Sequence, residues 1–391
     1  MSSPEMRSNS PELPRRVIGR IRGEEPGPTV ICVGAMHGNE PAGYRALERV
    51  CQALRGDNPP LKGEFLALLG NRRAFLAGLR FLSSDLNRHF SAQRIEASRQ
   101  GLLGSSSVPE DVELDELRIA MSSAFQRARG RVHVMDLHTT SGSSPAFALV
   151  ADTLLNRSFG LQFPSPLILG LEEELEGTLT EYVEELGHVA IGFEGGQHDD
   201  PLSTDRCEAA IWIALASSGQ VDAADFPQVE RSRELLESCR RGFPEVLEVR
   251  YRHAIDEQDE FRMEPGFQSF QRIEKGQLLA TDRDGEIRAG ERGRVLMPLY
   301  QKQGEDGFFI MREFKPIWLT ISASLRRLGL ESIIHWLPGV ERHPELSEAL
   351  SIDRRVARWY SLQLFHLLGY RRHRSSGNRL VVERRKHDSS L

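Results

Sequence analysis

The chain has 391 residues, of which 39% are hydrophobic and 27% charged, and its formal net charge is −6. This length is about twice that of a typical domain, so we predict two domains. The composition is that of an ordinary globular protein. The mild acidity gives no overall attraction for nucleic acid or for an anionic membrane, so neither is expected as a partner. The polar first thirty residues hold no signal-like apolar stretch, and the four cysteines form no CxxC pair. We therefore expect a cytoplasmic protein with reduced thiols.

Short apolar runs alternate with helical patterns along the first part of the chain. After a lead-in at residues 1–14, which is expected to be disordered, strands are predicted at residues 29–33, 64–69, 131–137, 146–150 and 189–193. Helices are predicted at residues 41–54, 111–129 and 203–217. A stretch with many Ser and Gly residues, 93–108, is predicted to be a long surface loop. Buried strands that alternate with helices are typical of an α/β layer with a largely parallel sheet.

The pattern changes near Pro244. Strands are predicted at residues 246–254, 277–281, 286–287 and 308–311, with Asp284-Gly285 as a hairpin turn. We therefore predict an α/β domain at residues 15–243 and a small, mainly β domain at residues 244–315. Residues 316–391 are predicted to be a helical extension with a basic tail that is solvated.

Polar clusters follow directly after several of the predicted strands. In open α/β sheets, ligands bind beyond the carboxyl ends of the strands. The clusters are Gly34–Glu40, Asn71-Arg72-Arg73, Asp136–Thr140 and Glu194-Gly195-Gly196, with Asp85–Arg88 between the second and third in sequence. Such a set of polar residues at strand ends is hard to explain by the needs of folding.

His37 and Glu40 have the short HxxE spacing that lets two side chains reach one metal ion from a tight turn. His138, at the end of another predicted strand, is the best-placed third ligand, and a His-Glu-His set suits Zn²⁺ better than Ca²⁺ or Mg²⁺. Taken alone, the pair is also typical of a loop histidine and of a carboxylate at a helix N-terminus. Asp85 and Asp136 are candidates either for orienting ligand histidines or for capping turns.

Together, GAMHGNEPAG, NRRAF, DLNR, MDLHTTSG and FEGG resemble the succinylglutamate desuccinylase/aspartoacylase family, whose members are relatives of the zinc carboxypeptidases. The motifs span residues 34–196 in the order of the family, and a weaker resemblance continues to about residue 315. It implies an α/β fold with a zinc carboxypeptidase-like mixed sheet flanked by helices, followed by a small, mainly β domain that helps to close the site. The resemblance does not cover the extension from residue 316.

The resemblance also implies roles for individual residues. One Zn²⁺ per chain would be held by His37, Glu40 and His138, and Glu194 matches the catalytic general acid and base.

Three further positions match residues of the family that contact the substrate. Asn87 and Arg88 match the residues that hold the substrate's carboxylate, and Arg73 matches the catalytic arginine that faces the reacting carbonyl. Arg72 stands where the family usually has proline, so it stays an alternative for the inward-facing arginine. Further candidates for contact with substrate are His198, near Glu194, and Tyr300, in place of a tyrosine that the family supplies from its β domain.

The implied activity is zinc-dependent hydrolysis of the amide bond of an N-acyl amino acid or a similar small, carboxylate-bearing amide. A zinc carboxypeptidase that acts on a peptide or peptide-like conjugate is an alternative, because Arg88 would serve either carboxylate. A catalytically silent binding protein of the same fold is a second alternative. The expected partner is the small-molecule amide, and the chain is a possible homo-oligomer. Pocket shape, which the sequence does not give, decides the acyl group and the amino acid.

Overall fold

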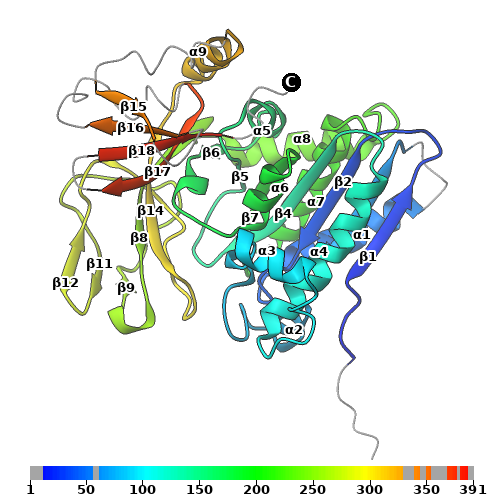
Figure 1. Cartoon of the computed structure of the whole chain (residues 1–391), viewed down its shortest axis with the longest axis horizontal. Coiled ribbons are helices and arrows are strands. Elements are labelled where there is room, and N and C mark those ends of the chain that lie inside the picture. The colour runs from blue at the N-terminus through cyan, green and yellow to red at the C-terminus, as the bar shows by residue number, and fades with distance from the viewer. Residues whose placement is uncertain are drawn as a thin grey trace, which may run out of the picture.

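The computed structural model describes residues 12–55, 61–328, 339–343, 349–353, 368–376 and 379–385. Most of the predicted lead-in, residues 1–11, lies outside these ranges. Figure 1 shows a layer of strands and helices at one side of the molecule and a group made mainly of strands, β8 to β18, at the other.

A mixed sheet of eleven strands runs through the molecule in the order β1-β3-β2-β4-β7-β5-β6-β8-β14-β13-β10. The strands are β1 (Val17–Arg22), β2 (Thr29–Gly34), β3 (Glu64–Leu69), β4 (Val132–Thr140), β5 (Phe147–Leu149), β6 (Leu167–Leu169), β7 (Val189–Gln197), β8 (Val246–Ala254), β10 (Arg272–Ile273), β13 (Gly293–Leu296) and β14 (Asp306–Glu313). Because β3, β2, β4 and β7 pair in parallel, their carboxyl ends meet at one edge of the sheet. Two of the polar clusters predicted from the sequence follow β2 and β3, and two form the carboxyl-terminal parts of β4 and β7, so the fold gathers them at this edge.

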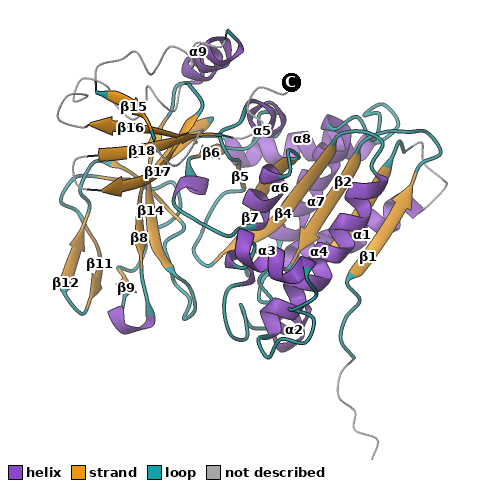
Figure 2. Cartoon of the chain, in the orientation of Figure 1, coloured by secondary structure: helices purple, strands orange, loops and turns teal. Residues whose placement is uncertain are grey.

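Helices cover both faces of this part of the sheet (Figure 2). They are α1 (Pro41–Arg55), α2 (Arg72–Ala77), α3 (Ala92–Arg99), α4 (Pro109–Arg127), α5 (Leu154–Gly160), α6 (Leu179–Glu185), α7 (Leu202–Ser217) and α8 (Pro227–Arg240). Side chains of β2 alternate between the faces: Val30 and Cys32 join the apolar cluster of α1 and α7, whereas Ile31 and Val33 join the cluster of α4. None of the helices in the described part of the chain is long and apolar enough to cross a membrane.

The predicted mixed α/β fold and its predicted strands and helices through residue 217 are confirmed. The loop predicted at residues 93–108 is partly wrong, because α3 occupies Ala92–Arg99. That helix buries Ile95 and Ser98, and the Ser98 hydroxyl donates to Asp115 Oδ1 at 2.5 Å. The segment has few apolar residues, but contacts of one face with α4 stabilise it as a helix. The loop is therefore confined to the residues after α3.

The strands predicted after Pro244 are also confirmed. Two of them, β8 and β14, extend the main sheet beyond β6, together with β13 and β10, which were not predicted. A separate three-stranded sheet contains β12 (Gly285–Arg288), β11 (Leu278–Asp282) and β9 (Arg262–Met263). Its hairpin pairs Asp282 with Gly285, as the Asp-Gly signal predicts. The domain boundaries at residues 243 and 315 stay predictions.

The helical extension predicted from residue 316 needs correction. Helix α9 (Pro316–Arg327) is present, but the described residues after it form a four-stranded sheet. Its strands are β15 (Val340–Arg342), β16 (Ala349–Asp353), β17 (Tyr370–Ser376) and β18 (Arg379–Arg384). The physical reason is that apolar residues occur at every second position in these strands, which places them on one face of the sheet. They pack into one apolar cluster that includes Leu350 and Ile352 of β16 and Leu380 and Val382 of β18.

The described residues of the basic tail form part of this sheet or directly follow it, and at least one of their arginines is buried. Arg385 has 4% of its surface exposed, and its Nη2 donates to Glu173 Oε1 at 2.7 Å. Asp152, just after β5, ion-pairs with Arg157, with Arg326 of α9 and with Arg385. Buried ion pairs therefore hold the extension against the α/β layer, which corrects the expectation of a solvated tail.

Candidate active site

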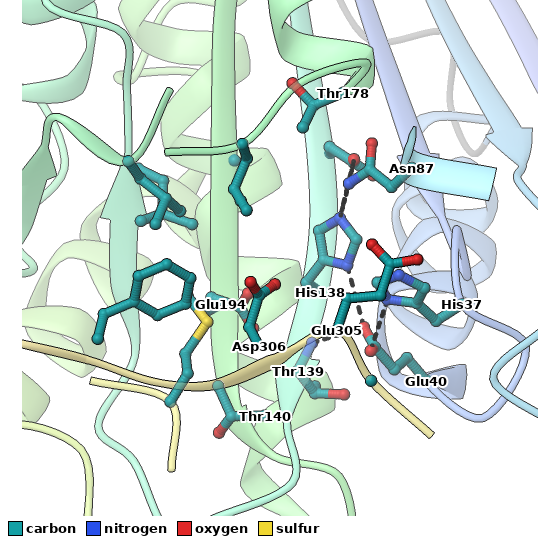
Figure 3. Close-up of a pocket in the computed structure, with 18 of the residues that line it drawn as sticks. His37, Glu40, Asn87, His138, Thr139, Thr140, Thr178, Glu194, Glu305 and Asp306 are labelled. Atoms are coloured by element: carbon teal, nitrogen blue, oxygen red, sulfur yellow. Dashed lines mark hydrogen bonds and ion pairs between the residues drawn. The ribbon is translucent and has the colours of Figure 1, made fainter. Parts of the chain in front are cut away.

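A pocket of about 150 Å³ lies where the carboxyl ends of β2, β4 and β7 meet the loop before β14. Figure 3 shows His37, Glu40, His138 and Glu194 together in it, with Glu305 from that loop and Asp306 at the start of β14. The fold therefore brings together side chains that are more than 260 residues apart in sequence.

The turn after β2 places His37 and Glu40. Strand β2 ends at Gly34, and Ala35 adopts the left-handed region with φ 55°, a strained value for a residue with a side chain. Gly38 follows, and a Cβ on it would lie 2.1 Å from the backbone carbon of Ala74. Only glycine fits there, because α2 packs directly against the turn. Glu40 then lies just before α1 and points back into the pocket.

The three predicted metal ligands converge. His37 Nδ1 lies 2.8 Å from Glu40 Oε1, and His138 Nδ1 lies 3.1 Å from Glu40 Oε2. Each of the three residues has at most 7% of its surface exposed. Their ligand atoms all lie within 4.8 Å of one another. Two imidazole nitrogens and a carboxylate at this spacing form a set of donors that fits Zn²⁺.

Two buried aspartates orient the histidines from behind. His37 Nε2 lies 3.0 Å from Asp85 Oδ1, and His138 Nε2 lies 2.8 Å from Asp136 Oδ2. Each Nε2–H can donate to its aspartate, which leaves Nδ1 with a free lone pair towards Glu40. Asp85 also caps a turn, since it accepts from Asn87 N at 2.8 Å. For Asp85, both readings from the sequence therefore have support; for Asp136, the orientation of a histidine has support. The donor set fits a bound metal.

Glu194, on β7 in register with His138 on β4, faces the same pocket. Burial raises the pKa of this carboxyl to about 7, opposed by His138 and reinforced by Glu40. Its Oε2 is buried and has no hydrogen-bond partner among the described residues. By contrast, the pKa of Glu40 is held well below its usual range, because His37 and His138 outweigh the effect of burial. One carboxylate is thus fixed as an anion, whereas the other is ready to exchange a proton near neutral pH.

The structure does not bring Arg72 or Arg73 to the pocket. Arg73 Nη1 donates to Glu113 Oε1 at 2.5 Å, and Arg72 pairs with Glu116. Both arginines lie in the first turn of α2, which turns them towards α4. The expectation that one of them faces the reacting carbonyl therefore needs correction.

Arg80, which the sequence analysis missed, is an arginine that does lie in the pocket, beside the predicted metal ligand Glu40. Its Nη1 lies 3.3 Å from Glu40 Oε1 and its Nη2 3.1 Å from Asp85 Oδ2, and it lines the pocket. Asn71 caps the start of α2 and Gly78, with φ 65°, ends it, so the chain turns back to the pocket. The sequence signal that could have identified Arg80 is its position, because it is the last cationic residue before Asp85-Leu86-Asn87-Arg88.

Asn87 and Arg88 line the pocket, as predicted, but both already have partners. Asn87 Oδ1 accepts from Leu179 N at 2.9 Å. Arg88 Nη2 donates to Asp306 Oδ2 at 2.9 Å, and Arg252 Nε holds the other oxygen of Asp306 at 2.5 Å. A carboxylate of the protein itself thus occupies the arginine that the resemblance assigns to the carboxylate of the substrate.

Asp306→Asn is expected to free Arg88 and to lower KM for a carboxylate-bearing amide by about tenfold, with kcat little changed. Steady-state kinetics measures this effect. Asp200→Asn is the matched control, because Asp200 pairs with Arg206 outside the pocket lining. An unchanged or higher KM in Asp306→Asn would show that Asp306 does not compete with substrate.

His198 and Tyr300 do not line the pocket. His198 Nδ1 lies 2.7 Å from Thr139 Oγ1, and its Nε2 lies 3.3 Å from Gln301 Oε1, so it connects β4 with the loop before β14. The Tyr300 hydroxyl donates to Glu264 O at 2.8 Å and accepts from Phe267 N. Their predicted contact with substrate is therefore replaced by a structural role, whereas Phe309 from the same β region lines the pocket.

Comparison with known proteins shows which family the region around this site resembles. The family described as "Succinylglutamate desuccinylase/Aspartoacylase catalytic domain" matches residues 26–212. A succinylglutamate desuccinylase from Burkholderia pseudomallei (strain 1710b) is 31% identical over 127 residues, 32% of this chain and 35% of that protein. The enzyme of the same name from Burkholderia cenocepacia is 32% identical over 129 residues, again 32% of this chain and 35% of that protein. The match thus spans about a third of the length of these curated relatives.

Solved structures show the same fold over most of the chain. A succinylglutamate desuccinylase/aspartoacylase from Rhodobacter sphaeroides aligns with a TM-score of 0.55 at 18% identity, over 75% of this chain and 88% of that one. The product-bound ectoine utilization protein EutE (DoeB) from Ruegeria pomeroyi aligns with a TM-score of 0.53 at 19% identity, over 75% and 87%. Residues 26–212 therefore resemble the catalytic domain of the succinylglutamate desuccinylase/aspartoacylase family, and the solved structures that carry this family name share the fold.

Proposed function

We propose that this protein is a zinc-dependent hydrolase that cleaves the amide bond of an N-acyl amino acid or a similar small amide. The observation that carries the proposal is the convergence of His37, Glu40 and His138 beside Glu194, whose buried carboxyl has a raised pKa. A silent binding protein would have no need of a proton-exchanging carboxyl next to a metal site.

The residues of the chain divide the chemistry among them. His37, Glu40 and His138 would hold one Zn²⁺ per chain, which lowers the pKa of bound water and polarises a carbonyl. Glu194 takes the proton of the attacking water and delivers it to the nitrogen of the leaving amine. Arg80 offers positive charge where the carbonyl oxygen becomes negative, and it is already oriented by Glu40 and Asp85.

The first test is metal content together with hydrolysis of N-acyl amino acids. The purified protein is expected to hold one Zn²⁺ per chain, and removal of the metal with a chelator is expected to abolish hydrolysis until zinc is restored. His37→Ala is expected to lose both metal and activity, because it removes one of three ligands. His343→Ala, outside the pocket lining, serves as the control. Full activity and full zinc in His37→Ala would overturn the proposal.

The same assay separates the proposal from its alternatives. A carboxypeptidase would prefer a peptide to an acyl amino acid of the same carboxyl-terminal residue. The pocket has a volume of about 150 Å³, and the loop before β14 lines part of it. This small space favours the acyl amino acid over a peptide as the substrate. A cytoplasmic location and a homo-oligomeric state stay predictions.

A further inference from the structure

The wall of the pocket beyond Glu194 is apolar. Strand β7, which carries Glu194, pairs with β4 on one side and with β5 on the other. The ligand His138 lies on β4, so the metal residues occupy one side of Glu194. The opposite wall consists of Leu149 and Val150 at the end of β5, Leu171, Leu175, Met297 and Phe309.

In the described pocket lining, no arginine or lysine is available to pair with an anion at this apolar wall. Arg80 and Arg88 are the two arginines in the described lining, and no lysine is among it. Arg80 pairs with Glu40 and Asp85, and Arg88 pairs with Asp306. Five carboxyl groups line the same pocket, those of Glu40, Asp136, Glu194, Glu305 and Asp306. A second carboxylate on a substrate would therefore meet apolar side chains and like charges.

We propose that the pocket takes an apolar acyl group and excludes an acyl group with its own carboxylate, such as the succinyl group. This inference rests on the proposed function and on the role that the resemblance implies for Arg88: an amino-acid carboxylate near Arg88 turns the acyl group towards the apolar wall. It separates this chain from the succinylglutamate desuccinylases that its sequence matches.

The size of the pocket limits the acyl group. Apolar cavities of about 150 Å³ accept a molecule of the size of benzene, and the whole pocket here has about that volume. Because the same pocket also holds the amide, an acyl group of about six carbons, such as hexanoyl, is the upper limit, and a long fatty chain does not fit inside it.

The test compares N-hexanoylglutamate with N-succinylglutamate, which differ only in the acyl group. The zinc-loaded protein is expected to hydrolyse the hexanoyl compound with a kcat/KM at least about 100-fold higher. Calorimetry on Glu194→Gln measures binding of the same pair without turnover. Hexanoyl binding without hydrolysis by the wild-type protein would support the acyl preference and overturn the proposed function. Equal or stronger binding of the succinyl compound, or no binding of either, would overturn the acyl preference, even if another amide is hydrolysed.

A charge placed on the wall sharpens the test. Leu171→Arg adds a cation there and is expected to reduce the preference for hexanoyl over succinyl by at least about tenfold. Leu186→Arg is the matched control, because Leu186 is partly exposed at the end of α6 and does not line the pocket. A preference that stays unchanged in Leu171→Arg, with the melting temperature retained, would contradict the assignment of this wall to the acyl group.

Discussion

Replacing Glu194 with glutamine is expected to lower kcat by about 10²–10⁴-fold while the zinc content stays at one per chain. Glutamine keeps the shape of the side chain but cannot take a proton from water. The residue is not among the clustered ligand atoms, so the metal should remain bound. Steady-state kinetics and metal analysis on the same preparation separate catalysis from metal loss. Glu208→Gln, on the neighbouring helix α7 and paired with Arg49, is the matched control.

The pH profile adds a signature of Glu194. A general base must be ionised, so kcat/KM is expected to rise with pH until the Glu194 carboxyl is deprotonated. Burial raises the pKa of this group to about 7, and His138, His37, Arg80 and a nearby metal cation all oppose that rise. The acid limb is therefore expected at or below a pH of about 7, and Glu194→Gln should lose it. A variant that keeps both the limb and the rate would exclude Glu194 as the base.

Asp152→Ala is expected to lower the free energy of unfolding by about 3–5 kcal/mol, the usual cost of removing one partner from a buried ion-pair network. Asp152 is 5% exposed, and it accepts from Arg326 Nη2 at 2.9 Å and pairs with Arg157. The substitution leaves these guanidinium groups buried without this carboxylate. Denaturant unfolding monitors the loss, and Asp205→Ala, which breaks an exposed pair with Arg49, is expected to cost less than about 1 kcal/mol.

The contribution of Asp152 depends on pH in a defined direction. Burial opposes ionisation of this carboxyl, but Arg157, Arg326 and Arg385 outweigh it, so its pKa in the folded protein lies below the usual value. Its stabilisation is therefore complete above the unfolded pKa of about 4 and is lost as the pH falls towards the folded pKa. Between pH 7 and pH 3, the wild-type protein should lose more stability than Asp152→Ala. Parallel stability curves for the two proteins would show that the network contributes nothing.

The α/β layer and the metal cluster are the parts that the sequence predicts well. Strands such as Thr29–Gly34 are buried on both faces and appear as uninterrupted apolar runs. His37 and Glu40 follow such a strand and His138 lies near the end of another, so local pattern and topology together place them at one edge. Glu194 is found for the same reason, since it lies on β7 in register with His138.

The parts that were missed depend on contacts between distant segments. Arg80 comes after a short helix rather than a strand, and its direction is set by the left-handed turn at Gly78. Asp306 reaches Arg88 across 218 positions of sequence, a pairing that no local pattern encodes. The strands after α9 are short, and their apolar residues alternate over only a few positions, which resembles a weak helical pattern.

The ion pairs of Arg385 also bear on the order in which the chain is synthesised. This arginine contacts Asp152 and Glu173, and these two residues flank the segments that supply Val150, Leu171 and Leu175 to the pocket wall. A ribosome releases the strands of the main sheet before residue 385 emerges, so the sheet can form while these ion pairs are still missing. A nascent chain would therefore complete its metal ligands early but receive the support for its proposed acyl-binding wall only after residue 385 has been synthesised.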